Sequence, residues 1–366
     1  MKVALYTGWL APQDATGHSV LAMHEALLAR GAESLIYCDR SSIQRPEVRV
    51  MNGARSHFRE WRRWRDTDVH LFHFGASYDL FNLLPWIPRG ARRMVYFHGL
   101  TPRALVPEAD RGWVDHSRRK FRIADRADVV LHATGYSKDL ALSMGVTRPD
   151  YIPLPLPVDL PEVPRPARRA DGVFRLLHVG RLVANKGLLE IVRALHLLET
   201  SGCRDWELEV VHNPLSANAI YETQVREFLA ASGLTKRVRF TGPPASRLDL
   251  AERYASADLT VLATRHETYC LPLLESLRCG TPVVACAAGA IPESAAGLAL
   301  LVPPDDITAL AAAIARARDA WPRMSCDEFG TMDAVDFHTS CRALLKDRTS
   351  EVFGERLRAI LTNRRG

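Results

Sequence analysis

The chain has 366 residues, 47% hydrophobic and 25% charged, with a net charge of +6, which suits an ordinary globular protein with room for two domains. No apolar run approaches the roughly 18 residues that a membrane-spanning helix needs, and the first residues turn polar too early for a signal peptide, so we expect a cytoplasmic protein. Seven cysteines without a C-x-x-C pair indicate neither a disulfide framework nor a zinc site.

Strand-like apolar runs alternate with helix-like stretches in the first half. We expect strands at residues 3–8, 34–38, 69–74, 93–99 and 129–134. Thr16 and Gly17 lie in the loop after the first strand, where a helix opens that ends at Gly31, so backbone amides should face the end of the sheet. This loop lacks the G-x-G-x-x-G spacing, and the chain has no G-x-x-x-x-G-K-[ST] motif. Nicotinamide enzymes and P-loop enzymes are therefore not indicated.

The stretch ARSHFREWRRWR, residues 54–65, concentrates positive charge. Residues 1–165 hold 23 Lys or Arg against 18 Asp or Glu, whereas the remainder holds 25 against 24. Three aromatic residues recur at a helical spacing among the arginines. One interpretation is a surface helix that lies on an anionic membrane or binds an anionic polymer, and the other is a solvated amphipathic helix whose aromatic side chains enter the core. The basic candidates are Arg62, Arg63 and Arg65.

Several polar residues flank the expected strands. His98 ends a strand at the carboxyl edge of the sheet, where it can face a cleft, although a structural histidine is the alternative. Asp66 and Asp68 form a D-x-D, a pattern that holds metal ions in other enzymes. Here it precedes a strand and lies at the amino edge, so we reject it as a metal site. Asp125 and Asp128 are rejected for the same reason.

A proline-rich stretch, residues 153–172, divides the chain. After it the alternation restarts with FRLLHVG, ELEVVHN, RVRFTG, LTVLAT, PVVACA and ALLV. Such units form parallel sheets covered by helices, and the proline-rich stretch is the natural linker. We predict an α/β protein of two doubly wound, Rossmann-like domains with a cleft at the carboxyl ends of their strands. The predicted division is 1–160, 161–330 and a helical tail at 331–366.

The loop HVGRLVANKG opens the second half. It leads from a strand through Gly180 to a helix that should begin near Lys186. Arg181 and Lys186 then emerge together at the carboxyl edge of the sheet, where two cations can neutralise a diphosphate. A basic loop that is merely solvated is the alternative.

The segment HETYCLPLLES, residues 266–276, places two glutamates eight positions apart. Pro272 is tolerated in the first turn of a helix and disfavours the α region for the residue before it, so the helix should begin near Leu271. Glu267 then lies in the preceding loop, and Glu275 lies in the first turn. Helix amides and two carboxylates can together bind phosphate and hydroxyl oxygens. The simpler alternative is a helix opened by an acidic residue, with Glu267 solvated.

Taken together, these residues resemble the GT-B glycosyltransferases, specifically the family-4 (glycosyltransferase group 1) enzymes, which retain configuration and use nucleotide sugars. The resemblance covers nearly the whole chain and is strongest over 174–315. HETYCLPLLE supplies the family's Glu-x7-Glu signature, and Gly180–Gly187 matches its G-R-L-V-x-x-K-G. The resemblance implies that 161–330 binds the nucleotide sugar, that 1–160 forms the acceptor side, and that 331–366 returns to the N-terminal domain.

The resemblance also implies a role for each candidate. The two cations would hold the diphosphate, the helix glutamate the ribose hydroxyls, and the loop glutamate hydroxyls of the donor sugar. His98 would reach that sugar from the first domain, while Thr16 and Gly17 would cap the diphosphate or border the acceptor. The expected donor site is Thr16, Gly17, Gly180, Arg181, Lys186, Glu267, Thr268, Tyr269, Cys270, Leu271 and Glu275. The expected catalytic set is Arg181, Lys186, Glu267 and His98.

Three loops depart from the family pattern. His212–Pro214 replaces a glycine-rich turn beside the nucleotide, Thr268–Cys270 replaces Gly-Phe-Gly, and Thr16–His18 replaces a double glycine. The base and the hexose are therefore left open.

The resemblance implies a retaining glycosyltransferase without a cofactor or a metal. It would move a hexosyl unit from a UDP- or GDP-linked sugar to a glycan, lipid-linked or small-molecule acceptor, by front-face attack. It would act in the cytoplasm or at the inner face of the membrane. The alternatives are a nucleotide-sugar 2-epimerase of the same architecture and a non-catalytic nucleotide-sugar-binding protein. Charge alone would allow a nucleic-acid-binding module, but no recognised motif supports one.

Overall fold

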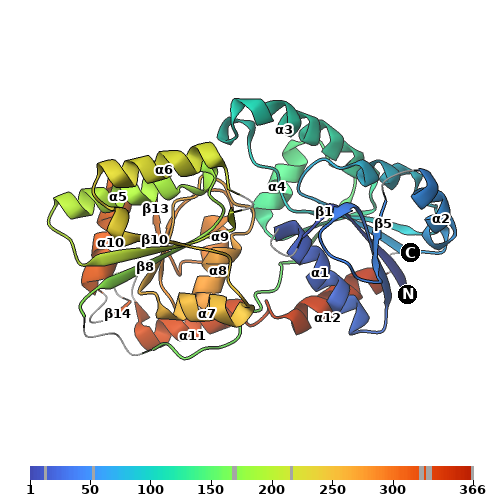
Figure 1. Ribbon diagram of the computed structural model, residues 1–366. Coiled ribbons are helices and arrows are strands. Elements are labelled where there is room, and N and C mark those ends of the chain that lie inside the picture. Colours follow the sequence, from blue (N-terminus) through green and yellow to red (C-terminus); the bar gives the residue numbers. More distant parts are fainter. Residues whose placement is uncertain are drawn as a thin grey trace. The chain divides into compact units, whose positions relative to one another are not determined.

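The computed structural model describes residues 1–11, 15–51, 54–166, 171–214, 217–320, 325–326 and 332–363. The chain forms two compact units (Figure 1). The first unit comprises Met1–Pro157 and Asp347–Gly366, and the second comprises Val158–Lys346. Each is built on a parallel sheet covered by helices, as predicted.

The first unit has a seven-stranded parallel sheet of order β3-β2-β1-β4-β5-β6-β7. Its strands are β1 (Lys2–Leu10), β2 (Glu33–Ser41), β3 (Val48–Val50), β4 (Val69–Phe74), β5 (Arg92–Phe97), β6 (Val129–His132) and β7 (Asp150–Pro153). Its helices are α1 (Ala15–Leu28), α2 (Ala54–Arg65), α3 (Glu108–Phe121), α4 (Gly135–Ser143) and α12 (Ser350–Thr362), with 3-10 segments η1 (Asp79–Trp86), η2 (Arg103–Leu105) and η3 (Arg122–Arg126). The five predicted strands are confirmed, whereas the edge strands β3 and β7 were not predicted because they are short and only partly buried.

Burial on both faces explains why the central strands read as largely apolar runs without a regular alternation of polar residues. All six residues of β4 are buried. The ring of Tyr6 on β1 stacks on Tyr37 of β2 and Phe72 of β4, with centroid separations of 5.3 and 4.2 Å. The turn into α1 is also tight, because a β-carbon at Gly17 would lie 2.3 Å from the carbonyl oxygen of Ala11. The sheet edge and the start of α1 are therefore held close together.

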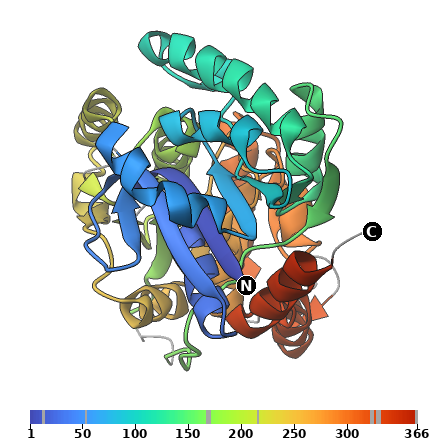
Figure 2. The ribbon, with the colours of Figure 1, turned by 90° about the vertical axis from the view of Figure 1, so that its right-hand side faces the viewer.

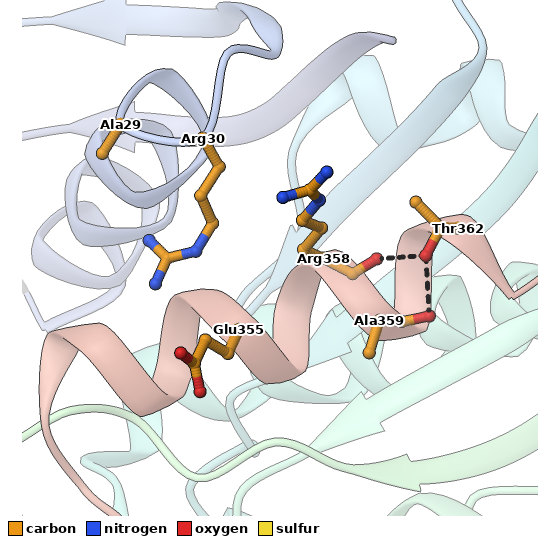
Figure 3. A pocket seen from close by; sticks show the side chains of 6 residues that line it. All are labelled: Ala29, Arg30, Glu355, Arg358, Ala359 and Thr362. Carbon is orange, nitrogen blue, oxygen red and sulfur yellow. Dashed lines mark hydrogen bonds between the residues drawn. The ribbon is translucent and has the colours of Figure 1, made fainter.

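The C-terminal helix α12 belongs to the first unit, where it contacts α1. Its buried face is Phe353, Gly354, Leu357 and Leu361. Arg30, just after α1, crosses Gly354, where a β-carbon would lie 2.2 Å from its Nη1, and its Nη2 donates to the carbonyl oxygen of Glu351 at 2.6 Å. Figure 2 shows α12 in red at the lower right and α3 in teal at the top. Figure 3 shows the pocket between the end of α1 and α12, lined by Ala29, Arg30, Glu355, Arg358, Ala359 and Thr362.

The second unit has a six-stranded parallel sheet of order β10-β9-β8-β11-β12-β13. Its strands are β8 (Phe174–Val179), β9 (Trp206–Val211), β10 (Val238–Thr241), β11 (Leu259–Leu262), β12 (Val283–Cys286) and β13 (Leu300–Val302), with a small antiparallel pair β14 (Ser325–Cys326) and β15 (Met332–Asp333). Its helices are α5 (Leu188–Thr200), α6 (Ala219–Ala231), α7 (Arg247–Ser256), α8 (Leu271–Arg278), α9 (Ile291–Ala295), α10 (Ile307–Ala320) and α11 (Ala334–Leu345), with 3-10 segments η4 (Ala184–Lys186) and η6 (Thr235–Arg237). The six predicted apolar runs each form a strand.

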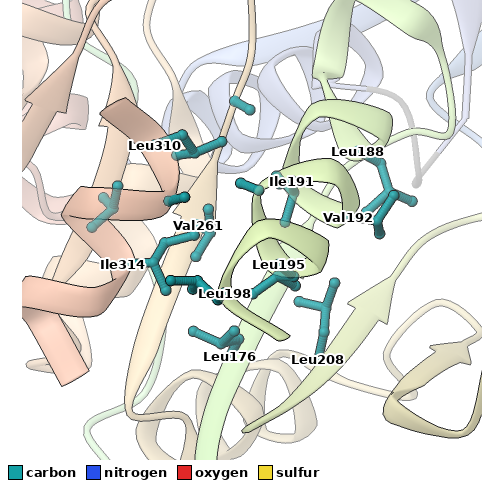
Figure 4. Packing of buried hydrophobic residues seen from close by; sticks show 14 of the residues in the cluster. Leu176, Leu188, Ile191, Val192, Leu195, Leu198, Leu208, Val261, Leu310 and Ile314 are labelled. Atoms are coloured by element: carbon teal, nitrogen blue, oxygen red, sulfur yellow. The ribbon is translucent and has the colours of Figure 1, made fainter. Parts of the chain in front are cut away.

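The core of the second unit lies under α5 and α10, which pack side by side (Figure 4). Leu195 of α5 and Ile314 of α10 are fully buried together with Val261 of β11. These three elements fix the loops that follow β8 and β11.

The two units are joined by a segment without helix or strand, residues 154–166, which lies within the predicted linker. Arg165 fastens this segment to the second unit, because its Nη1 donates to the carbonyl oxygen of Gly280 and its Nη2 to that of Ala257, both at 2.8 Å. The unit boundary falls at 157/158, close to the predicted boundary at 160.

The helical tail is shared between the units. The predicted third segment, 331–366, was expected to return as a whole to the first domain. Instead α11 contacts α8 and lies in the second unit, with Phe337 and Cys341 buried, and the return begins at Asp347. The contact between α11 and the segment just after α8 is close, because a β-carbon at Gly280 would lie 2.3 Å from the ring of His338.

A strained alanine in the second unit allows a stability prediction. Ala296, just after α9, is exposed and has a left-handed backbone, with φ 48° and ψ 38°. Ala296→Gly is expected to raise the free energy of unfolding by roughly 0.5 to 1 kcal/mol in urea denaturation, because glycine adopts this conformation without a steric cost. The control is Ala312→Gly at an exposed position within α10, which is expected to lower it by roughly 1 kcal/mol. Loss of stability in both variants would contradict the assignment of strain.

Candidate functional site

Two loops meet at the carboxyl edge of the second sheet. They follow β8 and β11, which are parallel neighbours in that sheet. The carbonyl oxygen of Asn185 in the first loop accepts the backbone N–H of Arg265 at 2.9 Å and the hydroxyl of Thr264 at 3.0 Å. These bonds bring the basic loop and the segment of the two glutamates together, as the common edge of a parallel sheet requires.

The centre of this site is an ion pair between Lys186 and Glu267. The Nζ of Lys186 lies 2.5 Å from Oε1 of Glu267, and the side chains are 21% and 14% exposed. Arg181 in the same loop is exposed and has no ion-pair partner among the described residues. The site thus holds one cation that a carboxylate already engages and a second that solvent surrounds.

Two glycines allow the loops to approach so closely. At Gly187, φ is +75° and a β-carbon would lie 1.9 Å from the carbonyl oxygen of Ala263. At Gly289, φ is +60° and a β-carbon would lie 2.2 Å from the carbonyl oxygen of Glu267, which accepts the backbone N–H of Ala290 at 2.8 Å. Gly289 was not predicted, because nothing near it in the sequence shows that it faces residue 267.

Helix α8 begins at Leu271, as Pro272 predicts. Thr268 and Leu271 are partly exposed, whereas Tyr269 and Cys270 are buried. Cys270 takes the left-handed conformation, with φ 63° and ψ 67°, and so turns the chain into the helix. The carbonyl oxygen of Tyr269 is already used within the unit, since Ser294 Oγ donates to it at 2.6 Å.

Glu275 lies deeper than Glu267. It is one residue beyond the first turn of α8, and its side chain is buried against α7. Tyr254 donates its hydroxyl to Oε2 at 3.1 Å, and Nη1 of Arg247 lies 3.4 Å from Oε1. Burial raises the pKa of Glu275, while Arg247 and the hydrogen bond from Tyr254 act in the opposite direction. Neither Arg247 nor Tyr254 was predicted.

In the first unit, the structure brings Thr16 and His98 together at the carboxyl edge of the sheet. A β-carbon at Gly75 would lie 3.0 Å from Oγ1 of Thr16 and 3.5 Å from Cβ of His98, so both border this glycine. The Nε2 of His98 forms a hydrogen bond of 2.9 Å with Nδ1 of His73, and its ring stacks on Tyr96 with a centroid separation of 4.6 Å. Burial lowers the pKa of His98 to about 3, so the ring is neutral near pH 7.

The aspartates rejected as metal ligands lie at the amino edge of the first sheet. Asp68 accepts the backbone N–H of Lys2 at 2.7 Å, and Asp128 accepts that of Arg93 at 2.8 Å. Asp125 accepts the backbone N–H groups of residues 147 and 148. These three carboxylates therefore accept backbone hydrogen bonds that hold strand ends and loops of the first unit in place. Among the residues that the structure describes, no group of three or more His, Cys, Asp or Glu is arranged to hold a metal ion.

The basic stretch forms helix α2, and its aromatic side chains divide between core and surface. Trp64 packs against the core of the first unit, whereas Trp61 is 51% exposed. Arg63 pairs with the buried Glu60 at 3.5 Å. Arg62 and Arg65 are exposed and form no ion pair with any described residue. No helix in the described ranges is long and apolar enough to cross a membrane.

Residues 173–319, which contain the second-unit site, match a protein-family model described as Glycosyl transferases group 1. The D-inositol 3-phosphate glycosyltransferase of Salinispora tropica is 35% identical over 116 residues, which are 31% of this chain and 24% of that protein. The lipopolysaccharide core biosynthesis mannosyltransferase LpsB of Rhizobium meliloti is 30% identical over 165 residues, 44% of each chain. The chain thus spans less than half the length of these two relatives.

The fold as a whole is similar to that of solved glycosyltransferase structures. Anabaena HepE in complex with UDP-glucose matches it with a TM-score of 0.73 over 100% of both chains, at 16% identity. This likeness confirms the predicted GT-B architecture of two Rossmann-like domains, and at such low identity it establishes the fold alone.

Proposed function

We propose that this chain is a group-1 glycosyltransferase that transfers a hexosyl unit from a UDP- or GDP-linked sugar to a hydroxyl group, with retention of configuration and without a metal ion. The observation that supports the proposal is the meeting of Lys186 and Glu267 across two loops, with the buried Glu275 on the helix that follows. Cations for a diphosphate and carboxylates for hydroxyl groups thus stand at one sheet edge.

Each residue has a place in this proposal. Lys186 and Arg181 neutralise the diphosphate, Glu275 accepts hydrogen bonds from the ribose hydroxyls, and Glu267 accepts them from the sugar. The backbone of Thr268–Leu271 completes the sugar site. From the first unit, His98 contributes a neutral imidazole toward the sugar, and Thr16 and Gly17 border the diphosphate or the acceptor. The residues that hold these positions are Thr16, Gly17, His98, Gly180, Arg181, Lys186, Glu267, Thr268, Tyr269, Cys270, Leu271 and Glu275.

The chemistry breaks the bond between the anomeric carbon and the diphosphate oxygen. The electron pair of that bond leaves with the diphosphate, whose growing charge the two cations stabilise. The acceptor oxygen then attacks from the same face, and its proton passes to the departing diphosphate oxygen. Both carboxylates already have partners within the second unit, since Lys186 engages Glu267 and Tyr254 donates to the buried Glu275. This favours front-face attack over a covalent glycosyl-enzyme intermediate.

The proposal is tested by thermal unfolding with UDP, GDP, ADP, dTDP and the sugar nucleotides of each. We expect one nucleotide class to raise the melting temperature with increasing concentration, because a ligand that binds the native state stabilises it. Transfer assays with that donor in EDTA should keep their activity. No stabilisation by any member would contradict donor binding. Conversion of UDP-N-acetylglucosamine to its 2-epimer would favour the epimerase, and binding without transfer would favour the non-catalytic alternative.

We further propose that helix α2 binds an anionic or lipid-linked acceptor, or lies on an anionic membrane surface. The support is Trp61, exposed beside Arg62 and Arg65, whose charges no described carboxylate neutralises. Arg63 is already tied to Glu60, so it contributes less than the other two arginines.

The test replaces Arg62 and Arg65 by glutamine and measures sedimentation with vesicles that contain anionic phospholipid. We expect roughly thirtyfold weaker binding, since each basic residue near such a surface contributes about 1 kcal/mol and two are removed. Arg119→Gln with Lys236→Gln removes the same charge from two other exposed positions and should change binding little. If both double variants bind the vesicles equally well, helix α2 is only a solvated helix and the proposal for it is wrong.

A further inference from the structure

The carboxylate of Glu275 is buried between α7 and α8, where bulk water solvates it only slightly. Its side chain is 8% exposed, and its hydrogen-bond and ion-pair partners among the described residues are Tyr254 and Arg247. Tyr254 is a neutral donor to one oxygen. Arg247 is a cation beside the other oxygen, and it keeps 40% of its own side chain exposed. A buried carboxylate with a single cationic partner depends strongly on that partner.

Arg247 is itself held from a second side. Its Nε donates to the carbonyl oxygen of Asp159 at 3.0 Å, in the segment that joins the two units. The guanidinium is therefore fixed between a backbone carbonyl and the carboxylate, and it is not a freely moving surface charge. This geometry orients Nη1 toward Oε1 of Glu275.

Other titratable groups near Glu275 do not replace this cation. Burial raises the pKa of Cys279, just after α8, to about 12, and burial also raises that of Cys270 just before the helix, so both thiols stay neutral. Strand β11 brings no titratable group, and Cys286 of β12 is also neutral, with its pKa raised to about 11 by burial. The remaining titratable groups on α8 and on the helices packed against it are Arg278 of α8, Asp249, Glu252 and Arg253 of α7, Glu293 of α9, and Asp336, His338, Cys341 and Arg342 of α11. None of them is a hydrogen-bond or ion-pair partner of Glu275.

We propose that Arg247 is a positioning residue for the donor nucleotide: it keeps the Glu275 carboxylate charged and oriented, so that this carboxylate can accept hydrogen bonds from the ribose hydroxyls. The inference rests on the proposed function, because it deepens the role of Glu275 in that site.

The physical consequence is a pH dependence that appears only when Arg247 is lost. Burial already raises the pKa of Glu275, and removing the cation that opposes this shift raises it further. A carboxylate protonates as the pH falls toward its pKa, and a protonated Glu275 offers one acceptor fewer to the ribose. Nucleotide affinity in the variant should therefore fall as the pH is lowered, whereas affinity in the parent protein should stay nearly constant.

The experiment measures dissociation constants for UDP-glucose and GDP-mannose by calorimetry at pH 6, 7 and 8. Sugar nucleotides are used because a free terminal phosphate titrates near pH 6 and would obscure the result. We expect Arg247→Met to bind the preferred donor about tenfold more weakly than the parent at pH 6 and to approach it at pH 8. Arg247→Lys should restore most of the loss. Arg239→Met, which removes an exposed partner of Glu209, is the matched control and should bind like the parent.

Three further outcomes separate the possible failures. If Arg247→Met is equally weak at all three pH values, or binds normally, the positioning role is wrong. If Arg247→Met with Glu275→Gln keeps the pH dependence, the titrating group is not Glu275 and the role is also wrong. If the parent protein binds neither sugar nucleotide nor any other donor, the proposed function itself fails. Circular dichroism of the parent and of each variant shows whether the protein is folded, so that weak binding is not mistaken for misfolding.

Discussion

Lys186→Ala is expected to lower turnover by about a hundredfold or more, the order found when one pre-organised charge-stabilising group is removed from an active site. The change acts in two ways, through the diphosphate and through Glu267, which Lys186 holds at 2.5 Å and which loses its ion-pair partner. Arg181→Ala should cause a loss of similar order through the diphosphate alone. The measurement is kcat and KM at saturating acceptor with the donor that the nucleotide panel identifies.

A double-mutant cycle sharpens this result. Glu267→Gln alone should impair use of the sugar, and combining it with Lys186→Ala should cost less than the sum of the two changes, because the residues are in direct contact. Lys236→Ala, at an exposed position in the same unit, serves as the control and should leave turnover unchanged. Near-normal turnover in both Lys186→Ala and Arg181→Ala would refute the diphosphate assignment.

Gly187→Ala is expected to lower the free energy of unfolding by about 3 kcal/mol or more, from the strain of an unsuitable backbone angle together with a steric overlap. The added β-carbon would lie 1.9 Å from the carbonyl oxygen of Ala263 and 2.9 Å from its Cβ. Since the first of these atoms is backbone, relief requires the loop or the end of β11 to move. Lys186 precedes this glycine directly, so donor affinity should fall as well.

The chain offers a matched control for this change. Gly233 has nearly the same angle, φ +73°, but nothing lies within 4 Å of an added β-carbon. Gly233→Ala should therefore cost only about 1 kcal/mol, the price of the left-handed conformation. Urea denaturation of both variants measures the difference. Equal costs would mean that the contact with Ala263 yields easily and that Gly187 is needed only for its backbone angle.

Features encoded over a few neighbouring residues could be predicted from the sequence. The start of α8 follows from Pro272, and the central strands follow from largely apolar runs. The edge position of Asp68 follows from its place before a strand. Lys186 and Glu267 were both identified, but only as ends of two loops; their direct contact depends on the adjacency of β8 and β11.

Contacts between residues far apart in the chain could not be predicted. Arg247 and Glu275 are 28 positions apart, and His73 and His98 are 25 apart, so no local pattern links them. Gly289 is recognisable only once its closeness to Glu267 is seen. Helix α2 shows a subtler limit: its aromatic spacing placed Trp61 and Trp64 on one face, where their rings stack at 5.0 Å, but it could not show that only Trp64 reaches the core.

The division of the helical tail has a consequence for how this chain can be taken apart. Because α12 belongs with Met1–Pro157, the second unit is an insertion within the first, entered at 157/158 and left at 346/347. A fragment that ends at residue 157 would lack a helix whose Phe353 and Leu357 are buried in its own unit, and it would expose the apolar surface of α1 beneath them. Val158–Lys346, in contrast, is one continuous cassette with both junctions outside its helices and strands. Moving the second unit between related chains is thus a matter of grafting one uninterrupted piece of sequence, while the receiving half has to be supplied as two.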